Sequence, residues 1–223
     1  MLTYAPIALA GLLLAGLIVW VVMARRRSSQ DTTRALEALG FSPCPDRKEW
    51  LEQTVARLED DSDVRYEVRH PKWLAGESPV YYYERHADTD EDSSAEEQVL
   101  CAVKRPSAEG LVLIVKPTSL SPGLAARMLG ALATSPWDSQ PDGLRRLDLP
   151  PDLRETNLLG ALGPPGASFY DLVDSPTLSV VQGLGDAGAM FVRFRDAWCS
   201  IARGSAQMPF RVDEIVARIR SLK

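Results

Sequence analysis

The longest uninterrupted apolar run of the chain lies near its N-terminus. Residues 5–24 read APIALAGLLLAGLIVWVVMA and contain no charged side chain. A helix of this length spans about 30 Å of hydrocarbon, at a rise of about 1.5 Å per residue. Arginines occupy positions 25–27, no basic residue precedes the run, and no small-residue cleavage site follows it. The pattern predicts a transmembrane helix and argues against the alternative, a cleaved signal peptide.

The three arginines also predict the orientation of this span. Basic residues concentrate on the cytoplasmic side of a membrane helix, so we expect the N-terminus outside and all residues after 27 in the cytoplasm. Within the span, Gly11 and Ala15 form a small-xxx-small pair. Such a pair allows two helices to approach closely in a homodimer, although in a span rich in Ala and Gly the same spacing arises by chance.

The chain after the span shows amphipathic helical patterns. Residues 28–44 read as a polar linker with a short helix that ends at Gly40. A longer helix is predicted to begin at Pro45, which suits a first helical position. Two more helices are predicted, one from Ser121 through about Ala133 and one over residues 212–222. The apolar face of the helix after Pro45 consists of Trp50, Leu51, Val55 and Leu58.

A period of two indicates strands. Val64, Tyr66 and Val68 alternate with charged residues, as in a strand with one solvated face. The unbroken apolar run LVLIV at residues 111–115 indicates a strand buried on both faces. Short connections between the first four strands favour an antiparallel meander. The predicted strands cover residues 64–70, 80–85, 98–104, 111–116, 177–182, 190–195 and 198–203.

The order of these elements predicts an α+β fold. We expect one N-terminal transmembrane helix, followed by a cytosolic domain of mainly antiparallel sheet with about seven strands and three or more amphipathic helices. Residues 1–27 would form the anchor and its basic flank, 28–44 the linker and short helix, and 45–223 the domain. The segment 135–176 is rich in Pro, Gly and Asp and is a candidate for a sub-boundary. The short helices predicted in that segment lie around residues 155–162 and 168–173.

Charge and composition narrow the class of partner. The chain has 25 Lys and Arg against 30 Asp and Glu. Three of the arginines and no acid lie in residues 1–27, so residues 28–223 carry 22 basic against 30 acidic side chains, a net charge of −8. An acidic domain is poorly suited to bind nucleic acid or anionic lipid. Abundant Arg, Ala, Gly and Pro are typical of a GC-rich genome, which favours a bacterial inner membrane as the location.

The residue types that commonly act in catalysis or metal binding do not form clusters or known motifs in the sequence. Cys44, Cys101 and Cys199 are far apart and lie on the predicted cytoplasmic side, so we expect free thiols. Cys44 lies at a predicted helix start, where the dipole lowers a thiol pKa, but no spacing brings His70 or His86 to it. No CxxC, HExxH, P-loop or GxSxG motif is present, so no catalytic residue, metal ligand or cofactor is predicted.

One glycine motif matches a dinucleotide fingerprint in its letters. Gly183, Gly185 and Gly188 fit G-x-G-x-x-G and follow a predicted strand. The fingerprint requires a helix after the glycines, because the helix N-terminus holds the pyrophosphate. Here the next element, residues 189–195, reads as a strand. We therefore expect a glycine-rich hairpin loop.

An acidic segment resembles a calcium loop only in part. Asp88, Asp90 and Asp92 match positions 1, 3 and 5, and Glu96 matches position 9, but position 6 is Ser93 where the loop needs Gly. A solvated acidic hairpin loop that docks a basic partner is the better interpretation. Tyr81, on a predicted strand, and Trp73 are two aromatic residues that would extend this contact surface. The candidate partner-contact residues are Asp88, Asp90, Glu91, Asp92, Tyr81 and Trp73.

These patterns support two functional hypotheses. The first is a membrane-tethered cytosolic interaction or assembly domain, a non-catalytic accessory subunit of an inner-membrane complex whose partner is another protein. The alternative is a small-ligand sensor or an enzyme with a dispersed site. An enclosed pocket with converging polar groups would favour the ligand, and an exposed sheet face bearing Tyr81 and Trp73 would favour the protein partner.

Overall fold

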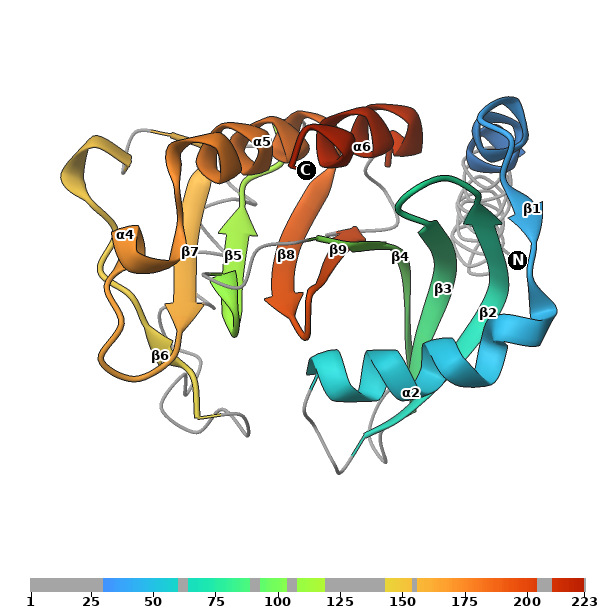
Figure 1. Cartoon of the computed structure of the whole chain (residues 1–223), viewed down its shortest axis with the longest axis horizontal. Helices are drawn as coiled ribbons and strands as arrows, with labels where there is room; N and C mark the ends of the chain where they lie inside the picture. Colours follow the sequence, from blue (N-terminus) through green and yellow to red (C-terminus); the bar gives the residue numbers. More distant parts are fainter. Residues whose placement is uncertain are drawn as a thin grey trace, which may run out of the picture.

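A nine-stranded sheet organises the chain. The computed structural model describes residues 30–59, 64–88, 93–103, 108–118, 143–153, 156–203 and 210–222. Every neighbouring pair of strands in the sheet is antiparallel (Figure 1). The strand order is β1-β2-β3-β4-β9-β8-β5-β7-β6. The meander predicted for the early strands therefore ends at β4, because β9 and β8 lie between β4 and β5.

The strands are β1 (Ser42–Pro43), β2 (Arg65–Leu74), β3 (Val80–Asp88), β4 (Ser93–Ala102), β5 (Leu111–Val115), β6 (Arg145–Arg146), β7 (Leu158–Gly163), β8 (Ala189–Arg195) and β9 (Trp198–Arg203). The α-helices are α2 (Lys48–Glu59), α4 (Phe169–Leu172), α5 (Ser175–Asp186) and α6 (Val212–Ile219), and a further helix covers residues 30–38. Short 3-10 helices are η1 (Pro45–Arg47), η4 (Pro151–Leu153) and η5 (Arg220–Leu222).

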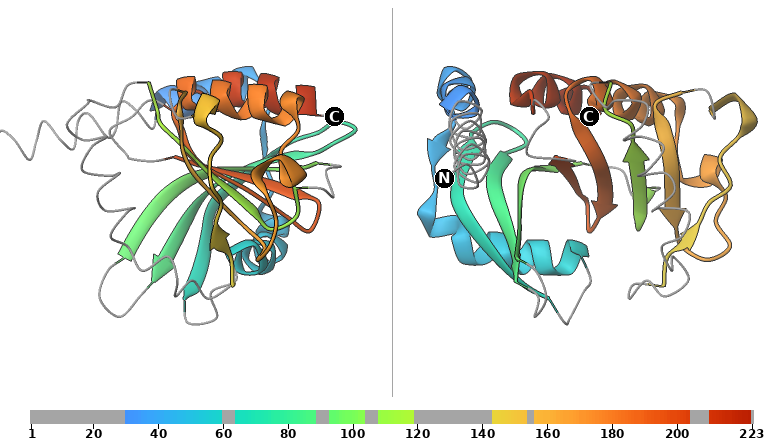
Figure 2. Two further views of the ribbon diagram at one scale, coloured as in Figure 1. Left: turned by 90° about the vertical axis from the view of Figure 1, so that its left-hand side faces the viewer. Right: turned by 180° about the vertical axis from the view of Figure 1, so that it is seen from behind.

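Helices cover both faces of the sheet. Helices α5 and α6 lie on one face and α2 lies on the other (Figure 2). Successive residues of a strand point to opposite faces. In β3, Val80 and Tyr82 accordingly join the core under α5 and α6, whereas Tyr81 and Tyr83 join the core under α2. The α2 core also contains Leu51, Val55 and Leu58 from the apolar face of the helix.

Much of the local structure matches the sequence patterns. The helix expected after Pro45 is confirmed as η1 followed by α2, and all five residues of β5 are buried as predicted. Strand β9 and the closing helix, α6 with η5, have the predicted bounds. Gly40 adopts φ +85° and ends the first described helix. Its N–H donates to the carbonyl of Glu37 at 3.0 Å, as in a glycine C-cap.

The strand predicted at residues 177–182 is wrong, because this segment belongs to α5. The β-branched residues of TLSVV suggested a strand, but the residues just before them favour the start of a helix. Asp174 is the N-cap, and its carboxylate accepts the N–H of Thr177 at 2.8 Å. Pro176 lies in the first turn, where its missing N–H costs little. Val181 and Leu184 are buried on the inner face of this helix.

The helix predicted around residues 155–162 is also wrong. Residues 158–163 form β7, which pairs with β5 on one side and β6 on the other. The sequence LLGALG suits a helix by propensity, but its leucines fill the space beside β5. The short helix expected at 168–173 is confirmed as α4, which begins with a capping box between Ser168 and Asp171.

The predicted fold class is wrong on two points. It expected about seven strands, whereas the sheet has nine, because β1, β6 and β7 were missed and one helix was taken for a strand. It also included an N-terminal transmembrane helix, whereas no helix among the described residues is long and apolar enough to cross a membrane. The span expected at residues 5–24, with Gly11 and Ala15, and the helix expected from Ser121 lie outside the described residues.

The glycine motif is part of a helix, not of a hairpin loop. Gly183 and Gly185 lie within α5 and are buried, and Gly188 follows the helix with φ +88°. A Cβ on Gly185 would lie 2.8 Å from the carbonyl oxygen of Lys116 and 2.8 Å from Cγ1 of Val115. The first two glycines of the motif are inside a helix and do not follow a strand, and Gly185 lets α5 approach the sheet closely. The motif therefore lacks both structural features of a dinucleotide fingerprint, a strand before the glycines and a helix after them.

We expect Gly185→Ala to lower the free energy of unfolding by about 2 kcal/mol, because the added methyl group meets backbone that cannot move away. Gly183→Ala is the matched control in the same helix. Its added Cβ would contact only the end of the flexible Arg218 side chain, so its effect should stay within about 1 kcal/mol. Urea unfolding of the purified proteins measures both values, and equal losses would contradict the packing argument.

Candidate functional site

Beyond the short strand β1, the outer side of β2 forms one edge of the described sheet. Strand β1 pairs with β2 at only two positions, Ser42 with Trp73 and Pro43 with Lys72. Residues 65–69 pair with β3 on their inner side and have no strand on their outer side in the described part of the chain (Figure 1). The edge of a sheet can pair with a further extended segment unless other groups of the protein cover it.

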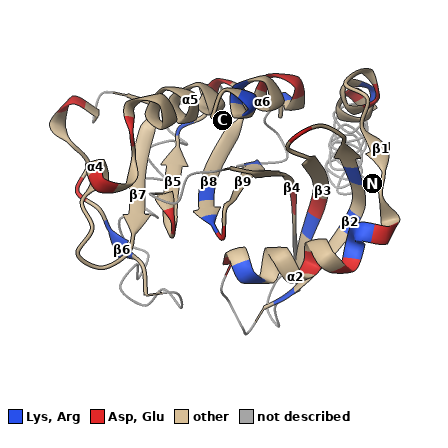
Figure 3. Cartoon of the chain, in the orientation of Figure 1, with Lys and Arg blue, Asp and Glu red and all other residues tan. Residues whose placement is uncertain are grey.

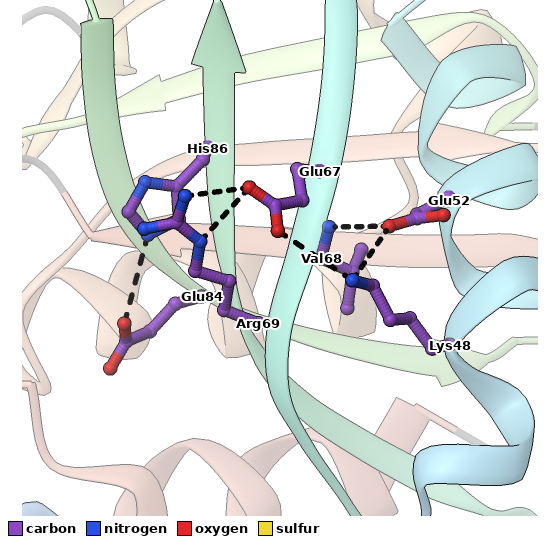
Figure 4. A network of polar contacts seen from close by, with 7 residues as sticks. All are labelled: Lys48, Glu52, Glu67, Val68, Arg69, Glu84 and His86. Carbon is purple, nitrogen blue, oxygen red and sulfur yellow. Dashed lines mark hydrogen bonds and ion pairs between the residues drawn. The ribbon is translucent and has the colours of Figure 1, made fainter.

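A side chain from α2 occupies part of this edge. The backbone N–H of Val68 donates to Oε1 of Glu52 at 3.1 Å (Figure 4). Nζ of Lys48, one turn earlier in α2, lies 3.7 Å from Glu52 and 3.6 Å from Glu67. The carboxylate of Glu52 thus replaces the carbonyl group that a neighbouring strand would supply. Natural sheets commonly blunt their edges with charged groups placed in this way.

A row of ion pairs lies on the sheet face opposite α2. Nη2 of Arg69 lies 2.7 Å from Oε2 of Glu67, and Nε2 of His86 lies 3.8 Å from Oε2 of Glu84 (Figure 4). Glu67 is directly opposite His86 in the β2–β3 register. The hydrogen bond from Arg69 lowers the pKa of Glu67. Acidic and basic residues are both present along α2, β2 and β3 at this end of the sheet (Figure 3).

A β-bulge ends the regular part of the edge. The β2–β3 register shifts between Arg69 and Lys72, and His70 adopts φ +51°. A bulge bends its strand and disrupts the ladder locally. Beyond it, the side chain of Trp73 is 40% exposed. Of the two aromatic residues predicted to contact a partner, Trp73 is the one on the surface.

The other aromatic candidate is part of the core. Tyr81 is only 6% exposed, and its ring centroid lies 5.1 Å from that of Trp50 and 6.3 Å from that of Trp198. Its alternation in β3 directs it under α2. The sequence did not show which of the three tyrosines would be exposed. In the structure none of them is, because helices cover both faces of the sheet at β3.

The acidic candidates lie at the far end of the β3–β4 hairpin. Asp88 ends β3 and pairs with Ser93, the first residue of β4. Asp90, Glu91 and Asp92 lie in the connection between these two residues, outside the described residues. The register confirms that a hairpin joins the two strands. It also shows that Ser93 to Glu97 belong to the paired strand and not to the loop.

A buried ion cluster fixes the C-terminal end of α2, and sequence reasoning missed it. The carboxylate of Glu59, the last residue of the helix, is bound by Arg85 from β3 at 2.6 Å and by Arg193 from β8. Nη2 of Arg85 also contacts Glu96 at 2.7 Å. Gln98 continues the network, since its Nε2 donates to Glu96 at 3.0 Å. No sequence spacing indicates this cluster, because its members come from four elements.

The two carboxylates of this cluster shift in opposite directions. Burial raises the pKa of Glu59, but the charges of Arg193 and Arg85 outweigh burial and leave the pKa below its usual value of 4.5. Burial also raises the pKa of Glu96, and there the charge of Arg85 does not compensate. Because Glu96 is bound to Arg85 in the strand, it cannot serve at position 9 of a calcium loop.

The cysteines are packed as small apolar side chains. All three are free and buried, as predicted. Burial, with a smaller contribution from Asp46, raises the pKa of Cys44 to about 11, which is opposite to the activation that a nucleophile requires. Among the described residues, no group of three or more His, Cys, Asp or Glu side chains could hold a metal ion.

A small cavity lies between the end of β4 and the C-terminal η5. Its volume is about 270 Å³, and its walls are mainly apolar. The charged groups at its margin, Glu77 and Arg220, are both exposed. Pockets for small organic ligands usually measure about 300–1,000 Å³ and direct several polar groups inward. The cavity gives weaker support to a ligand site than the β2 edge gives to a protein contact.

Comparison of the chain with protein-family models, curated proteins and solved structures found no match.

We expect Glu59→Gln to lower the free energy of unfolding by about 3 kcal/mol, because two largely buried guanidinium groups lose their shared carboxylate. Glu49→Gln is a matched control on an exposed position of the same helix and should change stability by less than about 0.5 kcal/mol. Urea unfolding at pH 7 tests the pair. Similar values for the two variants would show that the cluster does not hold α2.

The lowered pKa of Glu59 also predicts how stability depends on pH. A carboxylate whose pKa is lower in the folded state stabilises the fold above its usual value of 4.5 and loses this contribution as the pH falls below it. The wild type should therefore lose stability below pH 4.5 more steeply than Glu59→Gln. Glu96→Gln should keep the steep loss, because burial raises the pKa of that group. Thermal unfolding between pH 3 and 7 measures all three curves.

Proposed function

We propose that this chain is a non-catalytic interaction domain, an accessory subunit that binds another protein through the acidic end of the β3–β4 hairpin. This acidic end consists of Asp88, Asp90, Glu91 and Asp92. Strands β3 and β4 pair continuously from Val80 and Cys101 to Asp88 and Ser93. Strands β3 and β4 run away from α5 and α6 toward the end at which Asp88 pairs with Ser93 (Figure 2).

The distribution of charge along the hairpin carries the proposal. Residues 80–102 contain seven acidic side chains and one arginine. Two of the acids are neutralised inside the fold, because Glu96 binds Arg85 and Glu97 binds Arg203 at 2.5 Å. The acids of the acidic end are separate from these pairs in sequence. Unbalanced surface charge attracts an oppositely charged partner over a distance and orients its approach.

The exposed Trp73 would make a separate contact, because it pairs with Tyr81 near the start of β3 whereas Asp88 ends that strand, so the structure does not bring Trp73 to the acidic end. Trp73 is one of two large apolar side chains that are exposed in the described part of the chain. Tryptophan often supplies the apolar anchor of a protein interface. The cytoplasmic, inner-membrane location depends on residues 1–27, outside the described residues, and stays a prediction.

The test is affinity purification of the tagged full-length protein from its native membranes, followed by mass spectrometry. The variant should carry Asp90→Asn, Glu91→Gln and Asp92→Asn. Deleting residues 88–97 is unsuitable, because it would remove paired residues of β4 and the internal ion pairs. We expect a near-stoichiometric basic partner with the wild type and at least about ten-fold less of it with the variant, since three interfacial charges are removed.

The control neutralises three exposed acids elsewhere, Glu37→Gln, Glu49→Gln and Asp148→Asn. It removes the same net charge and should retain the partner. Equal loss of the partner in both variants would point to a general charge effect. Retention of the partner by the variant neutralised at positions 90–92 would refute docking through the acidic end.

A further inference from the structure

Two cysteines lie directly opposite each other in the middle of the sheet. Cys101 of β4 pairs with Cys199 of β9, and both side chains belong to the core under α5 and α6. The thiol of Cys101 donates to the carbonyl oxygen of Cys199 at 3.7 Å. Cys44 belongs to the core under α2, so the sheet separates it from the other two. Cys101 and Cys199 thus form a thiol pair within one core.

The backbone spacing of the thiol pair suits a disulfide. The N–H of Val103 donates to the carbonyl of Ala197 at 2.8 Å, which makes these two residues a hydrogen-bonded pair of the antiparallel ladder. The thiol pair lies two positions along the same ladder and is of the same kind, with Cα atoms about 5.5 Å apart. Disulfides usually join Cα atoms about 4.4–6.8 Å apart. A bond between the two sulfur atoms therefore needs rotation of the side chains and no large displacement of the strands.

A small molecule can reach Cys101 through the cavity between β4 and η5. Cys101 is part of the wall of this cavity, and the residues at its margin, Glu77 and Arg220, are exposed. The volume of about 270 Å³ has room for molecules of the size of water or hydrogen peroxide. Cys199 is completely buried and is not part of the wall that the described residues form. The two sulfurs therefore differ in access.

We propose that the thiol pair is an oxidative modification site, at which hydrogen peroxide converts Cys101 and Cys199 into a reversible disulfide. In the first step the Cys101 thiolate, its proton given to solvent, attacks one oxygen of the peroxide. An S–O bond forms, the O–O bond breaks, and the departing hydroxide takes up a proton to become water, which leaves Cys101 as a sulfenic acid. The sulfur of Cys199 then attacks this sulfur, so the S–S bond forms, the S–O bond breaks and a second water leaves. The two thiols thus supply the two electrons that reduce one peroxide.

The environments of the two sulfurs determine the order of these steps. Burial raises the pKa of Cys199 well above its usual value, and the neighbouring Cys101 raises it further. Because the thiolate is the nucleophile, Cys199 is unsuited to the first attack. Cys101 meets the peroxide in the cavity, and Cys199 acts as the resolving thiol. The second step is favoured because the reacting groups are already neighbours.

The disulfide joins the two parts of the sheet. The pairing of β4 with β9 is the link between the strands β1-β2-β3-β4 and the strands β9-β8-β5-β7-β6. Cys101 and Cys199 are 98 positions apart in the chain, and a cross-link over a long loop restricts the unfolded chain strongly. Oxidation therefore stabilises the sheet at its centre. This site is independent of docking through the acidic end of the β3–β4 hairpin.

Peptide mapping of the full-length protein in mild detergent tests the site. The protein is treated with hydrogen peroxide, its remaining thiols are blocked, and it is digested with trypsin without reduction. Each cysteine then lies in a separate peptide, residues 35–47, 86–104 or 196–203. We expect peptide 86–104 linked to peptide 196–203, a reduced Cys44, and reversal by dithiothreitol. The midpoint of urea unfolding should rise on oxidation and return on reduction.

Variants separate the roles of the two sulfurs. Cys199→Ala should leave Cys101 as a sulfenic acid that dimedone traps, whereas Cys101→Ala should leave Cys199 unmodified. Cys44→Ala is the matched control and should form the same linked product as the wild type. Ser78→Trp fills part of the cavity and changes neither sulfur. We expect it to slow the linkage at least about ten-fold, because thiol oxidation follows access.

Three outcomes overturn the proposal. The first is that no linked product forms in the folded protein, or that it forms only in urea concentrations that unfold the chain. The second is that Cys101→Ala and Cys199→Ala are modified alike. The third is that Ser78→Trp reacts as fast as the wild type, which would exclude access through the cavity. A urea unfolding curve of each variant distinguishes loss of the reaction from loss of the fold.

Discussion

The carboxylate of Glu59 is the contact on which the position of α2 depends. It is the last residue of the helix, at the negative end of the dipole, where an acid is unfavourable unless cations lie nearby. Arg85 from β3 and Arg193 from β8 supply those cations. The helix is thus held against two non-neighbouring strands at one end. Its apolar face fixes its rotation, and this rotation brings Glu52 to the N–H of Val68.

The outer side of β2 has no neighbouring strand beyond the short β1 in the described part of the chain. A sheet that is not closed into a barrel must protect its edges, and here one helix side chain and one bulge do so. The hydrogen bond from Val68 to Glu52 covers a single backbone N–H group, and the bulge affects only the residues between Arg69 and Lys72.

Neighbouring glutamates have different contacts in this fold, depending on the arginine that lies next to each of them. Glu96 and Glu97 are adjacent in an acidic stretch, yet they point to opposite faces and bind Arg85 and Arg203 respectively. The stretch looked like one acidic loop because sequence alone shows no distant partners. The glycine motif failed for the same reason, since the close contact of Gly185 is with Lys116, far away in the chain.

The sequence by itself determined the elements whose signals are local. These are α2 and α6 from their apolar period, β5 from its unbroken apolar run, and the helix end at Gly40 from its C-cap. Such signals arise within a few residues, so no fold is needed to interpret them. It also determined the acidic balance of the domain and the absence of recognised catalytic motifs.

The tertiary structure alone decided the rest. Whether TLSVV is helix or strand depended on capping, and whether LLGALG is strand or helix depended on the strands beside it. Three features depend on contacts between segments that are far apart in the chain. They are the packing of Tyr81 against Trp50, the ion pairs of Glu59 with Arg85 and Arg193, and the hydrogen bond from the Val68 N–H to Glu52. Burial and ion pairing depend on distances in space, and one sequence without its fold does not contain those distances.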